Sequence, residues 1–455
     1  MFHFYFRHEK YTHPDIVLGP NASLMAIDQR FALFAICDKD VNVYSHTTGP
    51  FFYINQFNHC THLVRIPLES FIKLAANVGC PPPRTKFVVL SNTGRCGSTL
   101  LTQLFEQLPN TVAISEPEVL MEFSQNPTFD AFSKTKKDRL LQSCITMLFK
   151  SASQSKANKD PIDVDSFVIK PKAHGISIAQ DLNSLYPSVK NLYMYRHPVE
   201  YVKSVRSVFK SILHPIVRHI MVYAAFDLNM YEFIMRQFGQ HFDDLNNPYS
   251  QKLQKALKDL DVDHNLEERF AALYCGNLLS IMSMAASGIN KVHVVSYHEL
   301  KDNTQADMKR ILEHCDMESF VTDLPENDSQ NNSGLSRNRL RSYQTALKEE
   351  EILIVDKVLQ STGFPSSKNF PIEADALTDI LGIKKASSHK ENRGSNRSSS
   401  SRYGSITEAY QKPQSTSKTS KDSLNNSKHN DDLSKSKTTP LLPNKTLWLP
   451  VNRFV

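Results

Sequence analysis

The chain has 455 residues, which is enough for two or three average domains or for one large domain with extensions. Its formal net charge is +6 at pH 7, and this excess comes from residues 386–446, where 11 Lys and Arg stand against 5 Asp and Glu. The rest of the chain is formally neutral, with 42 residues of each sign. The basic pI is therefore no evidence for a nucleic-acid-binding face on the rest of the chain, and any anion site has to be local.

Residues 386–446 are dominated by Ser, Asn, Lys, Thr, Gln and Asp, with only scattered large apolar side chains. Such a composition buries too little apolar surface to offset the entropy of ordering it. The sequence therefore predicts a disordered basic tail, which is a candidate for binding an unknown protein. Residues 447–455 turn apolar again and hold Trp448; the default expectation is a disordered end, and docking onto the body or a partner is the alternative.

The cysteines are odd in number and scattered, without a CxxC pair, which indicates reduced thiols in an intracellular protein. These are Cys37, Cys60, Cys80, Cys96, Cys144, Cys275 and Cys315. No apolar run approaches the roughly 20 residues of a membrane span, and the opening residues lack the features of a signal peptide. The expected location is the cytoplasm, without a membrane span.

Residues 1–80 form a predicted β-rich N-terminal module. Alternation and aromatic content place strands at 3–7, 32–37, 41–44, 51–54 and 61–66, followed by a helix at 69–77. Nothing in this module resembles a functional site.

The character of the chain changes after the Cys-Pro-Pro-Pro breaker at 80–83. Short continuous apolar runs, as expected of strands buried on both faces, occur at 86–90, 111–114, 167–169, 191–195 and 291–295, with helical segments between them. This alternation predicts an α/β domain over residues 86–370, with a mainly parallel sheet flanked by helices.

A candidate phosphate site follows the first of these strands, in Asn-Thr-Gly-Arg-Cys-Gly-Ser-Thr at 92–99. Glycines allow a tight turn and a close backbone approach, and the N-terminus of the following helix supplies unpaired N–H groups. Ser98 and Thr99 add hydroxyls, and Arg95 adds a charge that can bind two oxygens at once. A Walker A loop needs Lys where Gly97 stands, so an ATPase or kinase is disfavoured.

This loop, Arg95-Cys96-Gly97-Ser98-Thr99, resembles the 5′-phosphosulfate loop of sulfotransferases that use 3′-phosphoadenosine 5′-phosphosulfate (PAPS). That loop has the pattern Lys/Arg-x-Gly-Ser/Thr-Ser/Thr, and the Arg form is similar to the carbohydrate-type enzymes. The resemblance implies a P-loop fold, PAPS as co-substrate and no metal.

A second segment resembles the family's 3′-phosphate motif, a strand that ends in Arg-Asp-Pro with a Ser eight positions after the Arg. Here Arg196-His197-Pro198 ends the strand at 191–195, and Ser204 lies eight residues after Arg196. Pro198 suits the first turn of the next helix. His197 stands in place of the usual Asp, a departure that could alter the orientation of this loop.

Two weaker features agree with the resemblance, which covers about residues 86–344. Residues 294–300 (VVSYHEL) look like the tyrosine-acidic-Leu strand end of the family, with a helix predicted at 304–314. Residues 328–337 form a polar loop where sulfotransferases fold a C-terminal loop over the nucleotide, so Ser333 and Arg337 are candidate nucleotide contacts. A plain surface loop is the alternative.

For the acceptor proton, Glu116 is the candidate base, because it follows the strand at 111–114 at the sheet edge that holds the phosphate loop. Carbohydrate-type sulfotransferases similarly place a Glu here, often followed by Pro, and Glu118 is the alternate. Arg95 is the candidate for stabilising the departing phosphate. Lys170 and Lys172, at another strand end, are candidates for binding the sulfonate or an anionic acceptor.

The sequence thus predicts a sulfotransferase that moves the sulfonate of PAPS to a hydroxyl or amine of a small-molecule or carbohydrate acceptor. Another P-loop transferase, such as a small-molecule kinase, and a non-catalytic nucleotide-fold interaction protein remain open as alternatives. Carbohydrate-type enzymes usually sit in the Golgi behind an N-terminal anchor, so the Golgi is the alternative location if the N-terminus is incomplete.

Overall fold

The computed structural model describes residues 5–6, 8–79, 81–125, 129, 131–157, 164–173, 176–212, 248–258, 266–286, 292–323, 346–383 and 446–452. Residues 1–385 and 444–455 belong to one compact unit. Residues 386–443 make up a second unit, which lies outside the described residues, so the predicted disorder of the tail stays a prediction.

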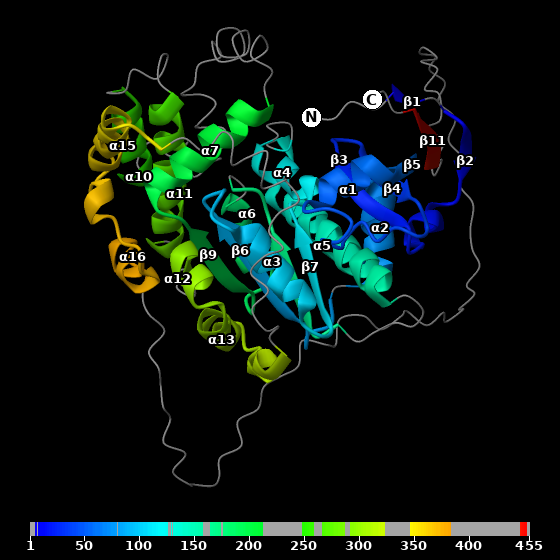
Figure 1. Cartoon of the computed structure of the whole chain (residues 1–455). Coiled ribbons are helices and arrows are strands. Elements are labelled where there is room, and N and C mark those ends of the chain that lie inside the picture. The colour runs from blue at the N-terminus through cyan, green and yellow to red at the C-terminus, as the bar shows by residue number, and fades with distance from the viewer. Residues whose placement is uncertain are drawn as a thin grey trace, which may run out of the picture. The chain divides into compact units, whose positions relative to one another are not determined.

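A five-stranded parallel sheet lies at the centre of the α/β domain, in the order β10-β9-β6-β8-β7 (Figure 1). Its strands are β6 (Lys86–Asn92), β7 (Thr111–Ser115), β8 (Ser166–Lys170), β9 (Lys190–Tyr195) and β10 (Val292–Ser296). All five are almost wholly buried, which explains their continuous apolar sequences. The predicted α/β class and the position of each strand are confirmed.

Alternate residues of these strands contribute to two hydrophobic clusters, one on each face of the sheet. Val88 and Leu90 belong to a cluster with α3 and α13, whereas Phe87 and Val89 belong to a larger cluster with α5, α6 and α11. The domain is therefore a sheet between two helical layers.

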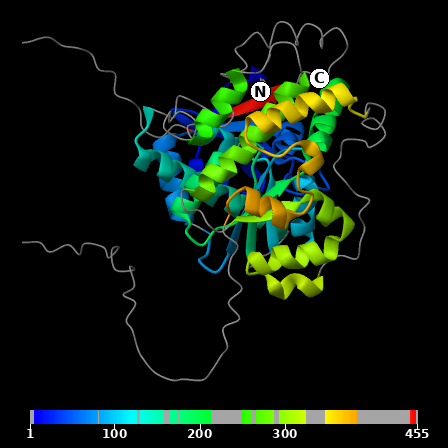
Figure 2. The ribbon, with the colours of Figure 1, turned by 90° about the vertical axis from the view of Figure 1, so that its left-hand side faces the viewer.

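The helices of the α/β domain follow the predicted alternation. They are α3 (Ser98–Gln107), α4 (Glu118–Gln125), α5 (Lys134–Ala157), α6 (Ile176–Leu185), α7 (Pro198–Ile212), α10 (Pro248–Lys258), α11 (Leu266–Ala286), α12 (Tyr297–Asp302), α13 (Thr304–His314), α15 (Glu349–Ser361) and α16 (Ala374–Ile380). Short 3-10 helices occur at η4 (Glu318–Asp323) and η5 (Ser367–Asn369). Helices α12, α13 and α16 pack at the β10 edge (Figure 2).

The strand order places a ligand site at the carboxyl end of β6. From β6 the chain crosses through α3 to the β7 edge, and it later returns to the other side of β6 as β9. Ligands of open parallel sheets bind where the order reverses in this way. The loops after β6, β7, β8 and β9 meet there.

A second, antiparallel sheet forms the N-terminal module. Its order is β1-β11-β5-β4-β3, and β2 also pairs with β11 (Thr446–Asn452). The elements are β1 (Tyr5–Phe6), β2 (Lys10–Thr12), η1 (Pro14–Leu18), β3 (Ala22–Ile27), β4 (Phe31–Cys37), α1 (Phe52–His59), β5 (Cys60–Pro67) and α2 (Leu68–Val78). The strands at 32–37 and 61–66 and the helix at 69–77 are confirmed; β3 was not predicted.

Two predicted strands of this module are wrong. Residues 41–44 contain no strand and lead into a turn, and helix α1 begins at Phe52. The buried side chains of α1 include Phe52, Asn55 and Gln56, which follow helical rather than strand spacing. The Gln56 amide donates hydrogen bonds to the Leu24 carbonyl (3.0 Å) and the Ser23 hydroxyl (2.9 Å), so polar partners in β3 stabilise the helix.

Most of the apolar segment 447–455 forms a strand, against the default expectation of a disordered end and in line with the alternative of docking onto the body. Residues Thr446–Asn452 form β11, the red strand among the blue ones in Figure 1. This strand pairs antiparallel with β5 from Leu447 opposite Arg65 to Pro450 opposite His62. It thereby covers an edge of β5 that would otherwise leave backbone N–H and C=O groups unpaired.

One hydrophobic cluster joins the two sheets. It includes Leu24, Phe34 and Phe71 of the N-terminal module together with Phe87 and Leu140 of the α/β domain. The N-terminal module thus packs directly against the domain that carries the candidate site. Among the described residues, no helix is long and apolar enough to cross a membrane.

Candidate nucleotide-binding and catalytic site

The phosphate loop after β6 is fixed by hydrogen bonds to both neighbouring strands. Oδ1 of Asn92 accepts a hydrogen bond from the Gly94 N–H (2.9 Å), and Nδ2 of Asn92 donates one to the Pro171 carbonyl (3.1 Å). The Thr93 N–H donates to the Met194 carbonyl at 3.1 Å. Because these partners follow β8 and lie in β9, the loop is held over the centre of the sheet.

The loop backbone has left-handed dihedral angles at three positions, with φ of 78° at Gly94, 51° at Arg95 and 87° at Gly97. A turn of this kind directs successive N–H groups toward one side, which favours an anion. Helix α3 begins at Ser98, so its first unpaired N–H groups and the positive end of its dipole lie at the same point.

The two predicted phosphate motifs meet in the structure. Nε of Arg95 donates a hydrogen bond to the Ser204 hydroxyl on α7 at 3.3 Å. Nη1 of Arg196, at the end of β9, lies 3.5 Å from the Arg95 carbonyl. Arg95, Arg196 and Ser204 therefore surround one small region at the carboxyl end of β6 and β9.

Two positive charges face each other in this region. The pKa of Arg95 is lowered by burial of its guanidinium first and by the nearby charge of Arg196 second. Anionic groups bound beside these two arginines would relieve the repulsion and would receive charged hydrogen bonds from them. The electrostatics of the site therefore fit a phosphate or sulfate group.

The Arg196 side chain is oriented by an acid and a ring. Its Nε donates to Glu200 on the next helical turn at 2.8 Å, and its guanidinium carbon lies 4.6 Å from the centre of the Tyr297 ring. Tyr297 begins α12, directly after β10. A Cβ atom at Gly97 would lie 2.5 Å from Cδ2 of Tyr297, so only glycine fits between the loop and this ring.

His197, the departure from the family pattern, does not point at Ser204 or Arg95. Its Nε2 lies 2.9 Å from the Ser367 carbonyl, and burial lowers its pKa. A neutral imidazole with Nε2–H donates to this carbonyl. The Tyr274 hydroxyl donates to the Arg196 carbonyl at 2.7 Å. Neighbouring residues therefore fix the backbone around position 197, where the resembled pattern has Asp.

Glu116 lies just beyond β7 and is paired with Lys170 at the end of β8. The Glu116 N–H donates to the Lys170 carbonyl at 2.7 Å, and Lys170 Nζ donates to the Glu116 carboxylate. The Lys170 side chain is 2 % exposed and that of Glu116 is 17 % exposed. A φ of 57° at Glu116 turns the chain sharply after the strand.

A second pair repeats this arrangement farther out, with Lys172 Nζ donating to the Glu118 carboxylate. The Glu118 side chain is 41 % exposed, compared with 17 % for Glu116, so Glu116 is the more enclosed of the two candidate bases. Both lysines are ion-paired partners of the candidate bases. The sequence placed these four residues at strand ends but did not indicate that they pair.

Aromatic residues of the N-terminal module also reach the site, and these were not predicted. Lys170 Nζ lies 5.2 Å from the centre of the Phe51 ring, and Lys172 Nζ lies 4.4 Å from that of Tyr53. A small cavity lies alongside, lined by residues that include Tyr44, His46, Phe52, Thr99 and Ser115. The aromatic content of 51–54 is visible in the sequence, but it favours a strand and does not indicate a place at the site.

Some predicted residues lie outside the described part of the chain. These are Ser333 and Arg337, in the predicted C-terminal loop over the nucleotide. Their role stays a prediction. Within the described ranges, no group of three or more His, Cys, Asp and Glu is arranged to hold a metal ion.

No protein-family model matches this chain, and no curated protein matches it significantly. Among solved structures, it is similar to a sulfotransferase from Mycobacterium avium, with 12 % identity, a TM-score of 0.37, and coverage of 66 % of this chain and 82 % of that one. A sulfotransferase from Alicyclobacillus acidocaldarius has 14 % identity, a TM-score of 0.28, and coverage of 61 % and 97 %.

A sulfotransferase domain from the curacin biosynthetic pathway has 12 % identity and a TM-score of 0.30, with coverage of 66 % of this chain and 98 % of that one. Similarity at this level does not identify a reaction. The function therefore has to be argued from the side chains of the site.

Proposed function

We propose that this chain is a PAPS-dependent sulfotransferase that acts on a hydroxyl or amine acceptor. The observation that carries this proposal is the convergence of Arg95, Arg196 and Ser204 from two separate loops on one region. PAPS has a phosphate on each side of its ribose. A loop with Arg95 for the 5′ side and a strand end with Arg196 and Ser204 for the 3′ side match that pair of charges.

The donor set fits this nucleotide better than ATP with magnesium. Gly97 leaves no Walker lysine, and in this proposal Arg95 and Arg196 would neutralise phosphate oxygens directly. Cys96 is buried, so it would contribute its backbone N–H, together with those of Gly97, Ser98 and Thr99.

When bound, the nucleotide would supply the sulfonate and the phosphate leaving group. Arg95 would stabilise the charge that develops on the 5′-phosphate oxygens as the S–O bond to that phosphate breaks. As the oxygen of the acceptor hydroxyl bonds to sulfur, Glu116 would accept the proton that this hydroxyl loses. Lys170 would hold the Glu116 carboxylate in place before this transfer, and their ion pair would weaken as the proton arrives.

Binding of the product nucleotide, 3′-phosphoadenosine 5′-phosphate (PAP), tests the nucleotide part of the proposal. We expect PAP to raise the melting temperature of the full chain and the Arg196→Ala variant to lose this shift. Arg310→Ala is a matched control, because Arg310 is also paired with carboxylates but lies on α13. No binding of PAP, or equal binding by the Arg196→Ala variant, would overturn the proposal.

One observation favours a second candidate, a nucleotide-binding protein without turnover. Glu116 is largely enclosed and already held by Lys170, so its proton acceptance requires that this pair weaken. Transfer of labelled sulfonate from PAPS to a pool of acceptors separates the candidates. Turnover supports the enzyme, and PAP binding without turnover on any acceptor supports the second candidate.

A further inference from the structure

The C-terminal strand β11 lies inside the antiparallel sheet, with other strands on both of its sides (Figure 1). On one side, residues 447–450 pair with β5. On the other side, residues 446–448 pair with β2 and residues 451–452 pair with β1. Each of the seven residues of β11 therefore has a backbone partner in at least one neighbouring strand. We call the space that β11 fills, between β5 on one side and β1 and β2 on the other, the strand slot.

The strand slot joins the first residues of the chain to the rest of the sheet. Among the described strands, β1 and β2 pair with β11 only, and the next strand of the sheet is β5. Without β11, one edge of β5 and the facing edges of β1 and β2 would lose their hydrogen-bonding partners. Backbone edges of this kind bind extended segments by adding them to the sheet as a strand. The slot is therefore a site that a strand can enter and leave.

The proline of β11 suits the register in which this strand lies. Pro450 has no N–H and cannot donate to a ladder. It lies opposite His62 of β5, but on the other side it falls between the two ladders, since the pairs with β2 end at Trp448 and those with β1 begin at Val451. A slip of two residues in either direction would set the proline opposite β1 or β2. The sequence of the segment thus specifies its register in the slot.

A long polar segment separates β11 from the α/β domain along the chain. Residues 386–443 make up a separate unit, and their composition predicts a flexible coil. A coil of about 60 residues has an r.m.s. end-to-end distance of roughly 40–45 Å, which gives β11 an effective concentration on the order of millimolar at its own slot. The same strand from another molecule therefore competes for the slot once the protein concentration approaches this value.

We propose that the strand slot is an interaction site, and that its partner is residues 446–452 of a second copy of this chain. Two copies exchange these strands, and each slot keeps the same ladders to β5, β2 and β1. A closed dimer of this kind needs no new contact surface, because the exchanged strand makes the contacts that it already makes within one chain. This interaction is independent of the proposed sulfotransferase activity.

Cross-linking between two variants of the full chain tests the exchange. Leu447 lies directly opposite Arg65, and the Cβ atoms of such pairs are about 4.5–5.5 Å apart, which a small shift brings within reach of a disulfide. One copy carries Arg65→Cys and the other carries Leu447→Cys, so a disulfide between these positions requires the strand of one copy in the slot of the other. The copies are mixed in mild urea at about 0.5 mM, near the effective concentration of the tethered strand, and then oxidised. Mass spectrometry of the peptides identifies the linkage.

We expect a disulfide between position 65 of one copy and position 447 of the other, in a fraction that falls about tenfold or more when the copies are mixed at about 5 µM. Adding Trp448→Pro to the Leu447→Cys copy should reduce the cross-link about fivefold, because residue 448 has a strand on each side and its N–H is needed in one of the two ladders. Lys445→Pro is the matched control, since it places a proline just before the strand, and it should leave the cross-link unchanged.

A chain that carries both Arg65→Cys and Leu447→Cys shows whether the variants keep the ladder, because it should form the disulfide within one molecule at about 5 µM. The proposal would be overturned if this chain cross-links internally while the mixed copies do not cross-link at any concentration. It would equally be wrong if the double variant forms no internal disulfide, or if Trp448→Pro has no effect. An Asn452→Cys copy, whose cysteine lies opposite β1, controls for random oxidation, and cross-linking to position 65 as efficient as that of Leu447→Cys would also contradict the exchange.

Discussion

Nε of Arg95 donates a hydrogen bond to the hydroxyl of Ser204 at 3.3 Å, although 109 positions separate the two residues in the chain. This contact joins the loop after β6 to the helix after β9. It orients a half-buried guanidinium that also faces the charge of Arg196. The Ser204 hydroxyl thus has two roles in the proposed site: it positions Arg95 and is itself a candidate phosphate ligand.

The Ser204→Ala variant should bind PAP about five- to tenfold more weakly, because it loses a hydrogen bond worth about 1 kcal/mol and loosens Arg95. Isothermal titration calorimetry measures this. Ser207→Ala, in the same helix, is the control, since the Ser207 hydroxyl donates to the Lys203 carbonyl of its own helix. Equal losses in both variants would contradict a specific role for Ser204.

The Glu116→Gln variant should lose acceptor sulfonation by about 10²–10⁴-fold, because the amide cannot accept the proton of the acceptor. PAP affinity should stay within about threefold of the unmodified chain, since the nucleotide contacts proposed here come from Arg95, Arg196 and the loop backbone. Initial rates with labelled PAPS measure the first effect, and calorimetry measures the second.

Glu118→Gln distinguishes the two candidate bases. Glu118 forms the same kind of pair with Lys172 but is 41 % exposed. We expect its variant to keep most of the activity. The assignment of Glu116 would be wrong if Glu118→Gln abolished turnover and Glu116→Gln did not.

The Gly97→Ala variant should lose both stability and nucleotide affinity. The φ of 87° at position 97 is strained for alanine. In addition, the new Cβ would displace the Tyr297 ring, on which the Arg196 guanidinium stacks. We expect a loss of about 2–3 kcal/mol in the free energy of unfolding, together with at least tenfold weaker PAP binding. Urea unfolding and calorimetry measure the two effects.

Gly79→Ala is the matched control for backbone strain without a clash. Gly79 has a φ of 86°, but nothing lies within 4 Å of the position that a Cβ would take. With its ψ of 166°, Gly79 lies in a backbone region open almost only to glycine, so this variant should cost about 1–3 kcal/mol while leaving PAP binding unchanged. If it weakened PAP binding as much as Gly97→Ala, the contact with Tyr297 would not explain the effect.

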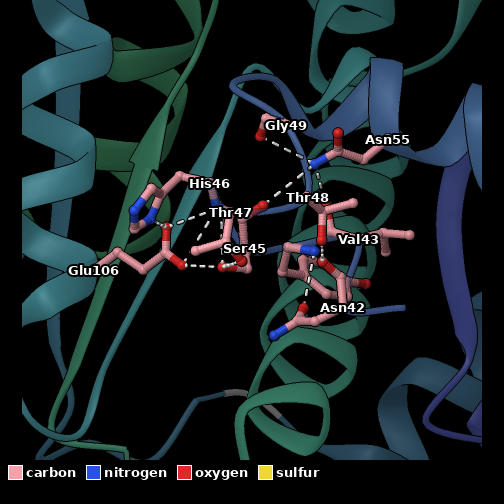
Figure 3. A network of polar contacts seen from close by, with 10 residues as sticks. Asn42, Val43, Ser45, His46, Thr47, Thr48, Gly49, Asn55 and Glu106 are labelled. Atoms are coloured by element: carbon pink, nitrogen blue, oxygen red, sulfur yellow. Dashed lines mark hydrogen bonds and ion pairs between the residues drawn. The ribbon is translucent and has the colours of Figure 1, made fainter. Parts of the chain in front are cut away.

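Stability should also depend on pH through the pair of His46 and Glu106, in which Nδ1 of the imidazole lies 2.8 Å from the carboxylate (Figure 3). The pKa of His46 is raised above 6.5, first by its hydrogen bond to Glu106. A raised pKa in the folded state stabilises the protein fully below pH 6.5, and this contribution is lost as the pH rises through the folded-state pKa. The free energy of unfolding should therefore fall by about 1 kcal/mol over that range.

Urea unfolding from about pH 6 to about pH 9 checks this, with His46→Gln as the comparison. The difference between the two proteins should shrink as the pH rises. His59→Gln, at an imidazole 3.9 Å from Asp38, is the control and should follow the unmodified chain. A difference that stays constant with pH would show that protonation of His46 contributes nothing.

The central sheet and the glycine-containing turn after β6 could be predicted from the sequence because their signals are local. A strand buried on both faces has to be continuously apolar, as at Lys86–Asn92, and a tight turn into a helix has to contain glycine, as at Gly94 and Gly97. At 51–54 the local signal gave the wrong prediction, a strand in place of the start of α1. Aromatic residues favour strands, but the partners of Asn55 and Gln56 favour a helix there.

By itself, the sequence thus determined the five strands, the turn from β6 into α3 and the strand-end positions of Glu116 and Arg196. Only the tertiary structure decided that Lys170 holds Glu116, that His197 turns to Ser367, and that Phe51 and Tyr53 lie over the lysines. The reason is physical. Backbone geometry and burial act on neighbouring residues, whereas ion pairs and ring contacts depend on which strand ends and which loop the packed core brings together.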